Sequence, residues 1–298
     1  MPAFPGTEEF QLLENVDKNR FTSICWLLGC SLIFPGILMT MLGCKGSIEE
    51  SRSKSIQIAA HRGASHLAPE NTIVSARLAW KLGADAVECD VQQTIDGEIV
   101  VIHDLSTDRV SGEHLWVGKT PWRRLKGLDV GSHMGTEYVG EEIPTLYDFL
   151  MTLPEGKSLL LEVKSGPEIL EGLERVLARS GKQKQVVLMS FRLEVLVLAK
   201  RRWPKMTMVF LKKAAQDFST GKRLAHGVHL IEIVQRNNLD GLGLDVRGFN
   251  EEIAREAKRA GLLLYVWTVD DPAVAGKFVP MGVDVLITNR PGWMRKRM

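Results

Sequence analysis

Five ionisable side chains stand at or near the ends of short apolar runs, and their types suit chemistry on a phosphate ester. They are His61, Glu88, Asp90, His103 and Glu162. Three carboxylates can hold one hard divalent cation, Ca²⁺ or Mg²⁺, because both ions prefer oxygen ligands. Two imidazoles can pass protons on either side of a substrate. We therefore expect a metal site formed by the three acids and an acid–base pair formed by the two histidines.

The spacing of these residues supports the prediction. Side chains alternate between the faces of a strand, so Glu88 and Asp90 share one face and Cys89 takes the other. An unpaired acid is costly to bury, which favours a functional pair over two isolated charges. A single strand-end acid is more often a solvated charge, and His61 alone could equally be structural. Arg62 and Lys164 add positive charge for an anionic ligand.

Apolar runs alternate with amphipathic stretches from residue 55 to the end, which predicts βαβ units and a parallel sheet. The expected strands are 56–60, 85–91, 98–103, 158–163, 185–190, 206–211, 241–244, 262–268 and 283–287. The expected helices are 70–82, 145–152, 168–180, 192–202, 250–260 and 272–280. The length is close to the roughly 250 residues of a (β/α)8 TIM barrel, with a doubly wound open sheet as the alternative.

A barrel also explains the placement of the ionisable residues, because such enzymes build their sites at the C-terminal ends of strands. His61, Glu88, Asp90, His103 and Glu162 are all expected at that rim. Residues 103–140 are rich in Gly, Ser, Thr and Trp and lack a long periodic element, which is typical of a functional insertion. Trp267 ends another apolar run and could be either core or pocket wall.

The N-terminal part of the chain has a different composition. Residues 1–20 are polar, 21–44 contain no charged residue, and 45–54 are polar and charged. The uncharged run exceeds the roughly 20 residues that span a bilayer. It predicts either an uncleaved membrane anchor or a lipoprotein-type signal ending at Cys44, with a buried helix as a weaker alternative. We expect a membrane-anchored protein whose catalytic domain, residues 55–298, is extracytoplasmic, at a periplasmic or cell-surface position.

The bulk composition excludes some classes of protein. The net charge of +2 gives no reason to expect a nucleic-acid partner. Of the four cysteines, only Cys89 lies outside the N-terminal segment, so no disulfide framework is expected for the barrel.

In a series of short motifs the chain resembles the glycerophosphodiester phosphodiesterases. These motifs run in order along the chain: His61-Arg62-Gly63-Ala64, Pro69-Glu70-Asn71-Thr72, Glu88-Cys89-Asp90-Val91, Thr94-Ile95-Asp96-Gly97, His103-Asp104, Ile143-Pro144-Thr145-Leu146, Leu161-Glu162-Val163-Lys164, Ser190-Phe191, Val266-Trp267-Thr268-Val269 and Ile287-Thr288-Asn289-Arg290-Pro291. Each motif alone is weak, but together they are specific and cover residues 56–292.

The resemblance implies a (β/α)8 barrel of the phosphatidylinositol-phosphodiesterase type. It also implies one divalent cation on Glu88, Asp90 and Glu162, and His61 and His103 as general base and general acid. Arg62 and Lys164 would hold the phosphate, and Glu70 would support the metal or the substrate. Trp267 is expected among the substrate-binding residues. The chain departs from the family at Asn289, where Asp is usual, and this affects local hydrogen bonding more than catalysis.

The implied reaction is metal-dependent hydrolysis of a glycerophosphodiester to sn-glycerol 3-phosphate and an alcohol. Attack by water or by the substrate's own hydroxyl remains open. One alternative is a lysophospholipase D acting on single-chain lysophospholipids, with Leu115, Trp116 and Trp122 meeting the acyl chain or packing over the barrel. Another is an inactive barrel that binds lipid headgroups.

Overall fold

The computed structural model of the protein describes residues 55–298. Our predictions for residues 1–20, 21–44 and 45–54, including the anchor and the lipidation of Cys44, lie outside this part. No helix within residues 55–298 is both long enough and apolar enough to cross a bilayer.

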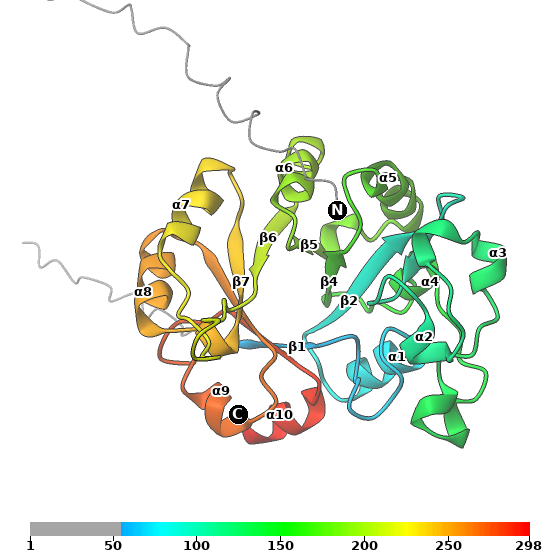
Figure 1. Ribbon diagram of the computed structural model, residues 1–298. Helices are drawn as coiled ribbons and strands as arrows, with labels where there is room; N and C mark the ends of the chain where they lie inside the picture. The colour runs from blue at the N-terminus through cyan, green and yellow to red at the C-terminus, as the bar shows by residue number, and fades with distance from the viewer. Residues whose placement is uncertain (1–54) are drawn as a thin grey trace, which may run out of the picture. The chain divides into compact units, whose positions relative to one another are not determined.

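Parallel strands close into a barrel surrounded by helices, as expected for a TIM barrel (Figure 1). The sheet order is β1-β9-β8-β7-β6-β5-β4-β2-β3, and β1 also pairs with β2, which closes the ring. All nine expected strands are present, with these bounds: β1 Gln57–Ala60, β2 Ala86–Gln93, β3 Ile99–Val101, β4 Ser158–Val163, β5 Val186–Ser190, β6 Thr207–Lys212, β7 Gly241–Asp245, β8 Leu263–Trp267 and β9 Val285–Thr288.

One strand differs from the expectation. β3 pairs with β2 in the antiparallel direction and forms a hairpin outside the barrel ring. We had expected His103 to follow a barrel strand, but it follows this hairpin strand instead. Because β2 extends beyond the rim and β3 runs back along it, the residue before His103 returns to the level of Asp90, with the Ile102 amide bonded to the Asp90 carbonyl at 2.9 Å. The hairpin, which extends beyond the C-terminal rim and turns back, thus brings His103 to that rim.

The six expected helices are present, several of them shorter than expected. They are α1 Ile73–Lys81, α4 Leu146–Leu150, α5 Ile169–Ser180, α6 Leu193–Arg202, α8 Glu251–Arg259 and α9 Pro272–Gly276. Outside the segment after His103, two further helices, α7 His229–Arg236 and α10 Pro291–Arg297, were not predicted. Both are short, and α10 begins with Pro-Gly, a pair that reads as a turn in sequence although proline is tolerated at a helix start.

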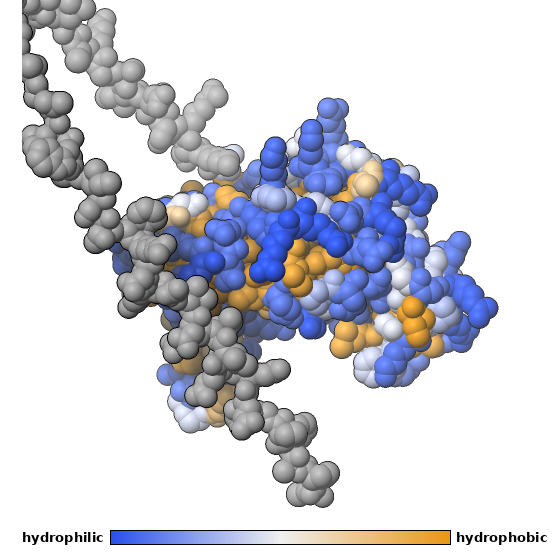
Figure 2. Space-filling view, turned by 90° about the horizontal axis from the view of Figure 1, so that it is seen from above, coloured by the Kyte–Doolittle hydropathy of each residue, from blue (hydrophilic) through white to orange (hydrophobic). Residues whose placement is uncertain are grey.

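Two apolar layers pack against the strands, one inside the barrel and one outside it. The inner layer includes Ala59, Leu160, Met189, Val209 and Tyr265, and the outer layer lies between the strands and the surrounding helices. Parallel strands covered on both faces need apolar residues on both, which explains their lack of a polar face. In the view of Figure 2, hydrophilic residues cover most of the described surface, with an apolar stretch near its centre.

The segment after His103 is a compact lobe with a small core of its own. It contains α2 (Asp108–Ser111), α3 (Trp122–Leu125) and short 3-10 turns, and lies beside β2 and α4 in Figure 1. Its core includes Val110, Val117 and Leu125, with Leu115 and Trp122 packed against it. The absence of a long periodic element in the sequence therefore reflects a lobe of short helices.

Candidate active site

Strands β2 and β4 carry the three carboxylates and lie side by side. Their register aligns Asp90 with Glu162, and Glu88 lies two residues earlier on the face of Asp90. Cys89, between the two acids, is buried in the outer core, as alternation predicts. One oxygen from each carboxylate lies within 4.8 Å of the others. The three predicted metal ligands therefore converge at the C-terminal rim of the barrel.

The carboxylate cluster fits a cation better than it fits the protein alone. Glu88 Oε1 and Asp90 Oδ1 are buried and have no hydrogen-bond partner within residues 55–298, although buried polar atoms normally have one. Burial, followed by the charge of Asp90, raises the pKa of Glu88 well above its ordinary value and that of Glu162 to about 7. Since a divalent cation would stabilise all three ionised groups, the donor set suits Ca²⁺ or Mg²⁺.

A strained turn after β1 aims Arg62 at this cluster. Arg62 has a φ of 55°, and Gly63 follows at 81°, where an added Cβ would lie 2.3 Å from the Ser75 hydroxyl. In this conformation the Arg62 amide donates to Glu88 Oε2 at 2.9 Å. Its guanidinium lies 3.2 Å from Asp90 Oδ2. Such strain is often found at functional sites, and here it holds the Arg62 guanidinium beside the acids.

Glu70 lies against Arg62. It accepts hydrogen bonds from Arg62 at 3.0 Å and from Arg109. The resemblance implies that Glu70 supports the metal or the substrate. In the structure its contact with the site runs through the Arg62 guanidinium, which it holds in position.

Lys164 lies on the other side of the acids. Its Nζ donates to Glu162 Oε1 at 2.6 Å and lies 3.4 Å from Asp90 Oδ1. Burial would raise the pKa of Asp90, but the positive charges of Lys164 and Arg62 outweigh it, and the pKa lies below its ordinary value. Arg62 and Lys164 both line the cavity, as a role in phosphate binding requires.

His61 is held by a chain of hydrogen bonds that crosses the closure of the barrel. Its Nδ1 lies 2.7 Å from Asn289 Oδ1, and Asn289 Nδ2 donates to Asp270 Oδ2 at 2.7 Å. Because a carboxylate only accepts, this fixes the orientation of the Asn289 amide, so Nδ1 of His61 must donate. Nε2 is then free to accept a proton, 3.9 Å from Glu88 Oε2. Burial and then Arg62 lower the pKa of His61, which keeps it neutral.

This series of hydrogen bonds explains why Asn rather than Asp stands at position 289. With Asn289→Asp, a carboxylate at position 289 would face the carboxylate of Asp270. We therefore expect this change to lower kcat by roughly 10–100-fold, the usual cost of losing an orienting partner. The double change Asp270→Asn with Asn289→Asp restores one donor and one acceptor and should recover most of kcat. Steady-state kinetics measures both variants.

The neighbouring Asp271→Asn is the control, since the Asp271 side chain only caps α9. Equal kcat values for the single and double variants would show that the chain does not position His61.

His103 is oriented by a charged partner. Its Nδ1 lies 2.6 Å from Asp104 Oδ1, and Asp104 in turn accepts from Arg109 Nε at 2.6 Å. Burial lowers the pKa of His103, and Arg62 adds to this, while the bond to Asp104 opposes it. The imidazoles of His61 and His103 therefore share one cavity but differ in their partners, a neutral amide in one case and a carboxylate in the other.

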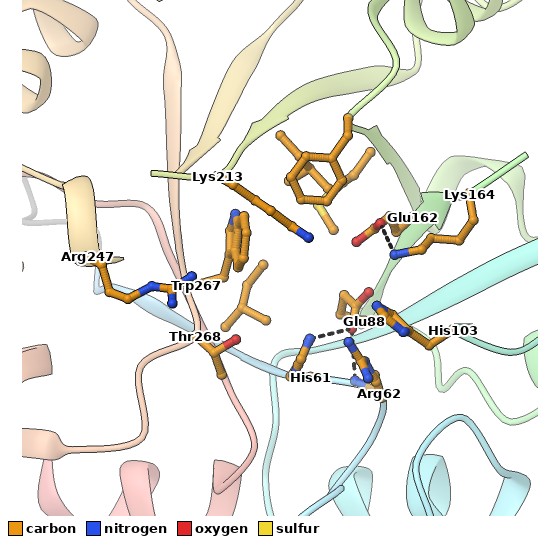
Figure 3. A pocket seen from close by; sticks show the side chains of 14 residues that line it. His61, Arg62, Glu88, His103, Glu162, Lys164, Lys213, Arg247, Trp267 and Thr268 are labelled. Carbon is orange, nitrogen blue, oxygen red and sulfur yellow. Dashed lines mark hydrogen bonds and ion pairs between the residues drawn. The ribbon is translucent and has the colours of Figure 1, made fainter. Parts of the chain in front are cut away.

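The cavity brings together most of the residues expected from the sequence. Of the predicted site residues, it is lined by His61, Arg62, Glu88, His103, Glu162, Lys164 and Trp267 (Figure 3). Asp90 lies directly behind them, buried. Trp267 both lines the cavity and packs on the inner core, so the two interpretations of it hold together. None of the other five histidines, all within residues 55–298, lines this cavity.

Sequence reasoning missed further lining residues. Lys213 follows β6, Arg247 lies in the turn after β7, and Phe191 follows β5, where its ring lies edge-on to Trp267 at 5.5 Å. The strand-end rule that identified the carboxylates would have found all three. Phe191 had been quoted within a motif, without a role.

Comparisons with known proteins give consistent matches over the barrel. Residues 61–293 match the model of the glycerophosphoryl diester phosphodiesterase family. A glycerophosphodiester phosphodiesterase of Bacillus subtilis is 31% identical over 297 residues, covering 94% of this chain and 98% of that protein. One from Caldanaerobacter subterraneus is 31% identical and covers 78% and 94%. A phosphodiesterase of Oleispira antarctica, solved in complex with the product sn-glycerol-3-phosphate, superposes with a TM-score of 0.72 at 30% identity, covering 81% and 96%.

Proposed function

The chain belongs to the glycerophosphoryl diester phosphodiesterase family and hydrolyses glycerophosphodiesters to sn-glycerol 3-phosphate and an alcohol, and we propose which residues carry this reaction. Glu88, Asp90 and Glu162 hold one divalent cation, and His61 and His103 move the protons. The observation that supports the assignment is a cluster of three buried carboxylates beside a cavity that both oriented imidazoles line.

Binding and charge neutralisation are the tasks of the cationic residues. When bound, the cation supplies Lewis-acid polarisation of a phosphoryl oxygen. Arg62 and Lys164 approach the same acids from two sides, and both line the cavity, so the phosphate of the substrate meets two fixed positive charges. Such preorganised charges stabilise a transition state in which negative charge develops on oxygen.

The partners of the two histidines support different roles for them. His61, held by the neutral amide of Asn289, stays uncharged and presents Nε2 as the general base. Burial lowers the pKa of both imidazoles, but the carboxylate of Asp104 opposes this lowering for His103, so His103 is the better suited of the two to act as the general acid that protonates the leaving alcohol. The base takes its proton from the attacking nucleophile, which is either water or the substrate's own hydroxyl group.

Metal removal tests the proposal. Treating the purified protein with EDTA should abolish release of glycerol 3-phosphate from glycerophosphocholine, and adding back Ca²⁺ or Mg²⁺ separately should restore it. Three carboxylates suit either ion, so the add-back experiment decides which of Ca²⁺ and Mg²⁺ supports activity. Full activity after exhaustive removal of metal would contradict the cation's role.

A second candidate substrate class is supported by a groove beside the cavity. Ile95, Leu105 and Trp116 are 64%, 61% and 47% exposed and line this groove, which shares Lys164 with the catalytic cavity. An acyl chain could lie there, as a lysophospholipase D requires. Leu115 and Trp122 do not contribute, because both pack on the lobe core. Comparing turnover of lysophosphatidylcholine with that of glycerophosphocholine distinguishes the two classes.

We also propose that residues 21–44 tether the enzyme to a membrane, with the barrel on the extracytoplasmic side. The proposal rests on the uncharged length of this segment. Fractionation of cells, followed by protease treatment of intact cells or spheroplasts, tests it. Recovery of the full-length protein in the soluble cytoplasmic fraction would contradict the tether.

A further inference from the structure

One guanidinium outside the catalytic cavity binds two carboxylates at once. Arg109 lies in α2, in the lobe after His103, and is not among the residues that line the cavity. Its Nε donates to Asp104 Oδ2 at 2.6 Å, while Nη1 and Nη2 donate to the two oxygens of Glu70 at 2.9 and 2.7 Å. The reaction assigned above gives Arg109 no role.

Each of these carboxylates also binds a side chain that lines the cavity. Asp104 Oδ1 lies 2.6 Å from Nδ1 of His103. Glu70 Oε1 accepts a hydrogen bond from Arg62 Nη1 at 3.0 Å. His103 and Arg62 lie on the same side of the cavity in Figure 3, although His103 follows the β2–β3 hairpin and Arg62 follows β1. Arg109 therefore links an acid–base residue of one element to a phosphate-binding residue of another.

The backbone at these two positions is held by other groups. Buried Gln92, on β2, donates through Nε2 to the carbonyls of residues 102–104 at 3.1, 3.2 and 2.5 Å, which fixes the main chain around His103. The main-chain amide of Arg62 donates to a carboxylate of the proposed metal site at 2.9 Å. Loss of the Arg109 guanidinium would therefore leave both main-chain segments in place and release the two side chains.

The lobe holds Arg109 on a supported segment. The next residue, Val110, is buried in the core of the lobe. Tyr138, also in the lobe, donates through its hydroxyl to the carbonyl of Leu67, in the loop between β1 and α1, at 2.6 Å. The lobe is thus fastened to the part of the barrel from which Arg62 comes. A guanidinium suits this place because its planar fork can bind carboxylates in fixed directions, whereas an ammonium is a compact point charge.

We propose that Arg109 is a positioning residue that orients the general acid and the phosphate-binding guanidinium together, so that the lobe completes the active site. This inference rests on the proposed function, because it takes from it the roles of His103 and Arg62. Through Asp104, Arg109 keeps the His103 ring directed at the leaving alcohol. Through Glu70, it keeps the Arg62 guanidinium directed at the phosphate. Arg109 acts through these two carboxylates and not by contact with the substrate.

The test is Arg109→Met in the full chain, with Ca²⁺ or Mg²⁺ present. On glycerophosphocholine, whose leaving alcohol needs a proton, kcat should fall by roughly 10–100-fold, the usual cost of losing an orienting partner. On the nitrophenyl ester of glycerol 3-phosphate, whose leaving group needs little protonation, kcat should fall much less. The Kd for glycerol 3-phosphate, measured by isothermal titration, should rise about tenfold, the value of one hydrogen bond to a charged group.

Arg124→Met is the matched control, because Arg124 is an arginine of the same lobe that also pairs with an acid, Glu113, and does not line the cavity. It should keep the wild-type kcat and Kd. Arg109→Lys is the second variant. It keeps the charge but not the fork, so it should restore at most one of the two effects.

Three results would overturn the positioning role and leave the proposed function standing. They are equal kcat losses of Arg109→Met on the two substrates, an unchanged Kd for glycerol 3-phosphate, and wild-type values of both quantities in Arg109→Lys. If the wild-type protein released no glycerol 3-phosphate from either substrate with Ca²⁺ or Mg²⁺ present, the proposed function would be overturned as well.

Discussion

Changing His103 to Ala should lower kcat for glycerophosphodiester hydrolysis by roughly 10²–10⁴-fold, the range that general acid catalysis contributes. The leaving alcohol would lose its proton donor, whereas the three carboxylates would keep their positions. Affinity for Ca²⁺ or Mg²⁺ should therefore change little. Steady-state kinetics and isothermal titration with the metal measure the two quantities separately.

His114→Ala is the control for this variant. His114 also pairs with an aspartate, Asp108, but it is exposed and does not line the cavity. It should keep full activity. A substrate with a very acidic alcohol, such as nitrophenol, needs little protonation and should be cleaved by His103→Ala with a much smaller loss. Equal losses on acidic and ordinary leaving groups, or weakened metal binding, would contradict the role of His103 in proton transfer.

The second large effect is expected at Glu88. Glu88→Gln removes one negative charge from the metal site and should weaken metal binding by on the order of 100-fold, since even changes outside the ligand set cost 10–100-fold. Activity at low metal concentration should fall accordingly and recover in part at high concentration. Unchanged metal titration would remove Glu88 from the ligand set.

Stability should move in the opposite direction. Burial raises the pKa of Glu88 in the folded protein above its pKa in the unfolded chain. In the absence of metal, this carboxyl therefore destabilises the fold once the pH rises above its unfolded-state pKa. Glutamine carries no charge, so it removes the cost of burying an ionised carboxylate, and it can still accept the hydrogen bond from the Arg62 amide. Glu88→Gln without metal should therefore melt at the same temperature as wild type or higher, most clearly at pH 8. The exposed Glu155, in the turn before β4, provides the control Glu155→Gln.

The sequence determined the strands of the barrel and which of their residues face the site. Apolar runs of a few residues, separated by amphipathic stretches, permit little besides a parallel sheet covered on both faces. Strand alternation then places Glu88 and Asp90 together, and the structure confirms this through the register of β2 and β4. Local periodicity carries this information because it depends only on neighbours along the chain.

Strand direction needed the tertiary structure. The run before His103 looks like any other apolar strand, and nothing local shows that it turns back on β2. The prediction placed His103 correctly at the rim but for the wrong reason, because the hairpin, and not the end of a barrel strand, delivers it. A short strand cannot reveal its pairing partner without the contacts that stabilise it.

Closure of the barrel decided the rest. His61 and Asn289 are 228 residues apart, yet they share a hydrogen bond because β1 pairs with β9. Lys213 and Arg247 meet the carboxylates across one cavity for the same reason. Sequence patterns identify which residues stand at strand ends. Which of them touch depends on how the strands are ordered around the ring and how the side chains pack, and both are properties of the whole chain.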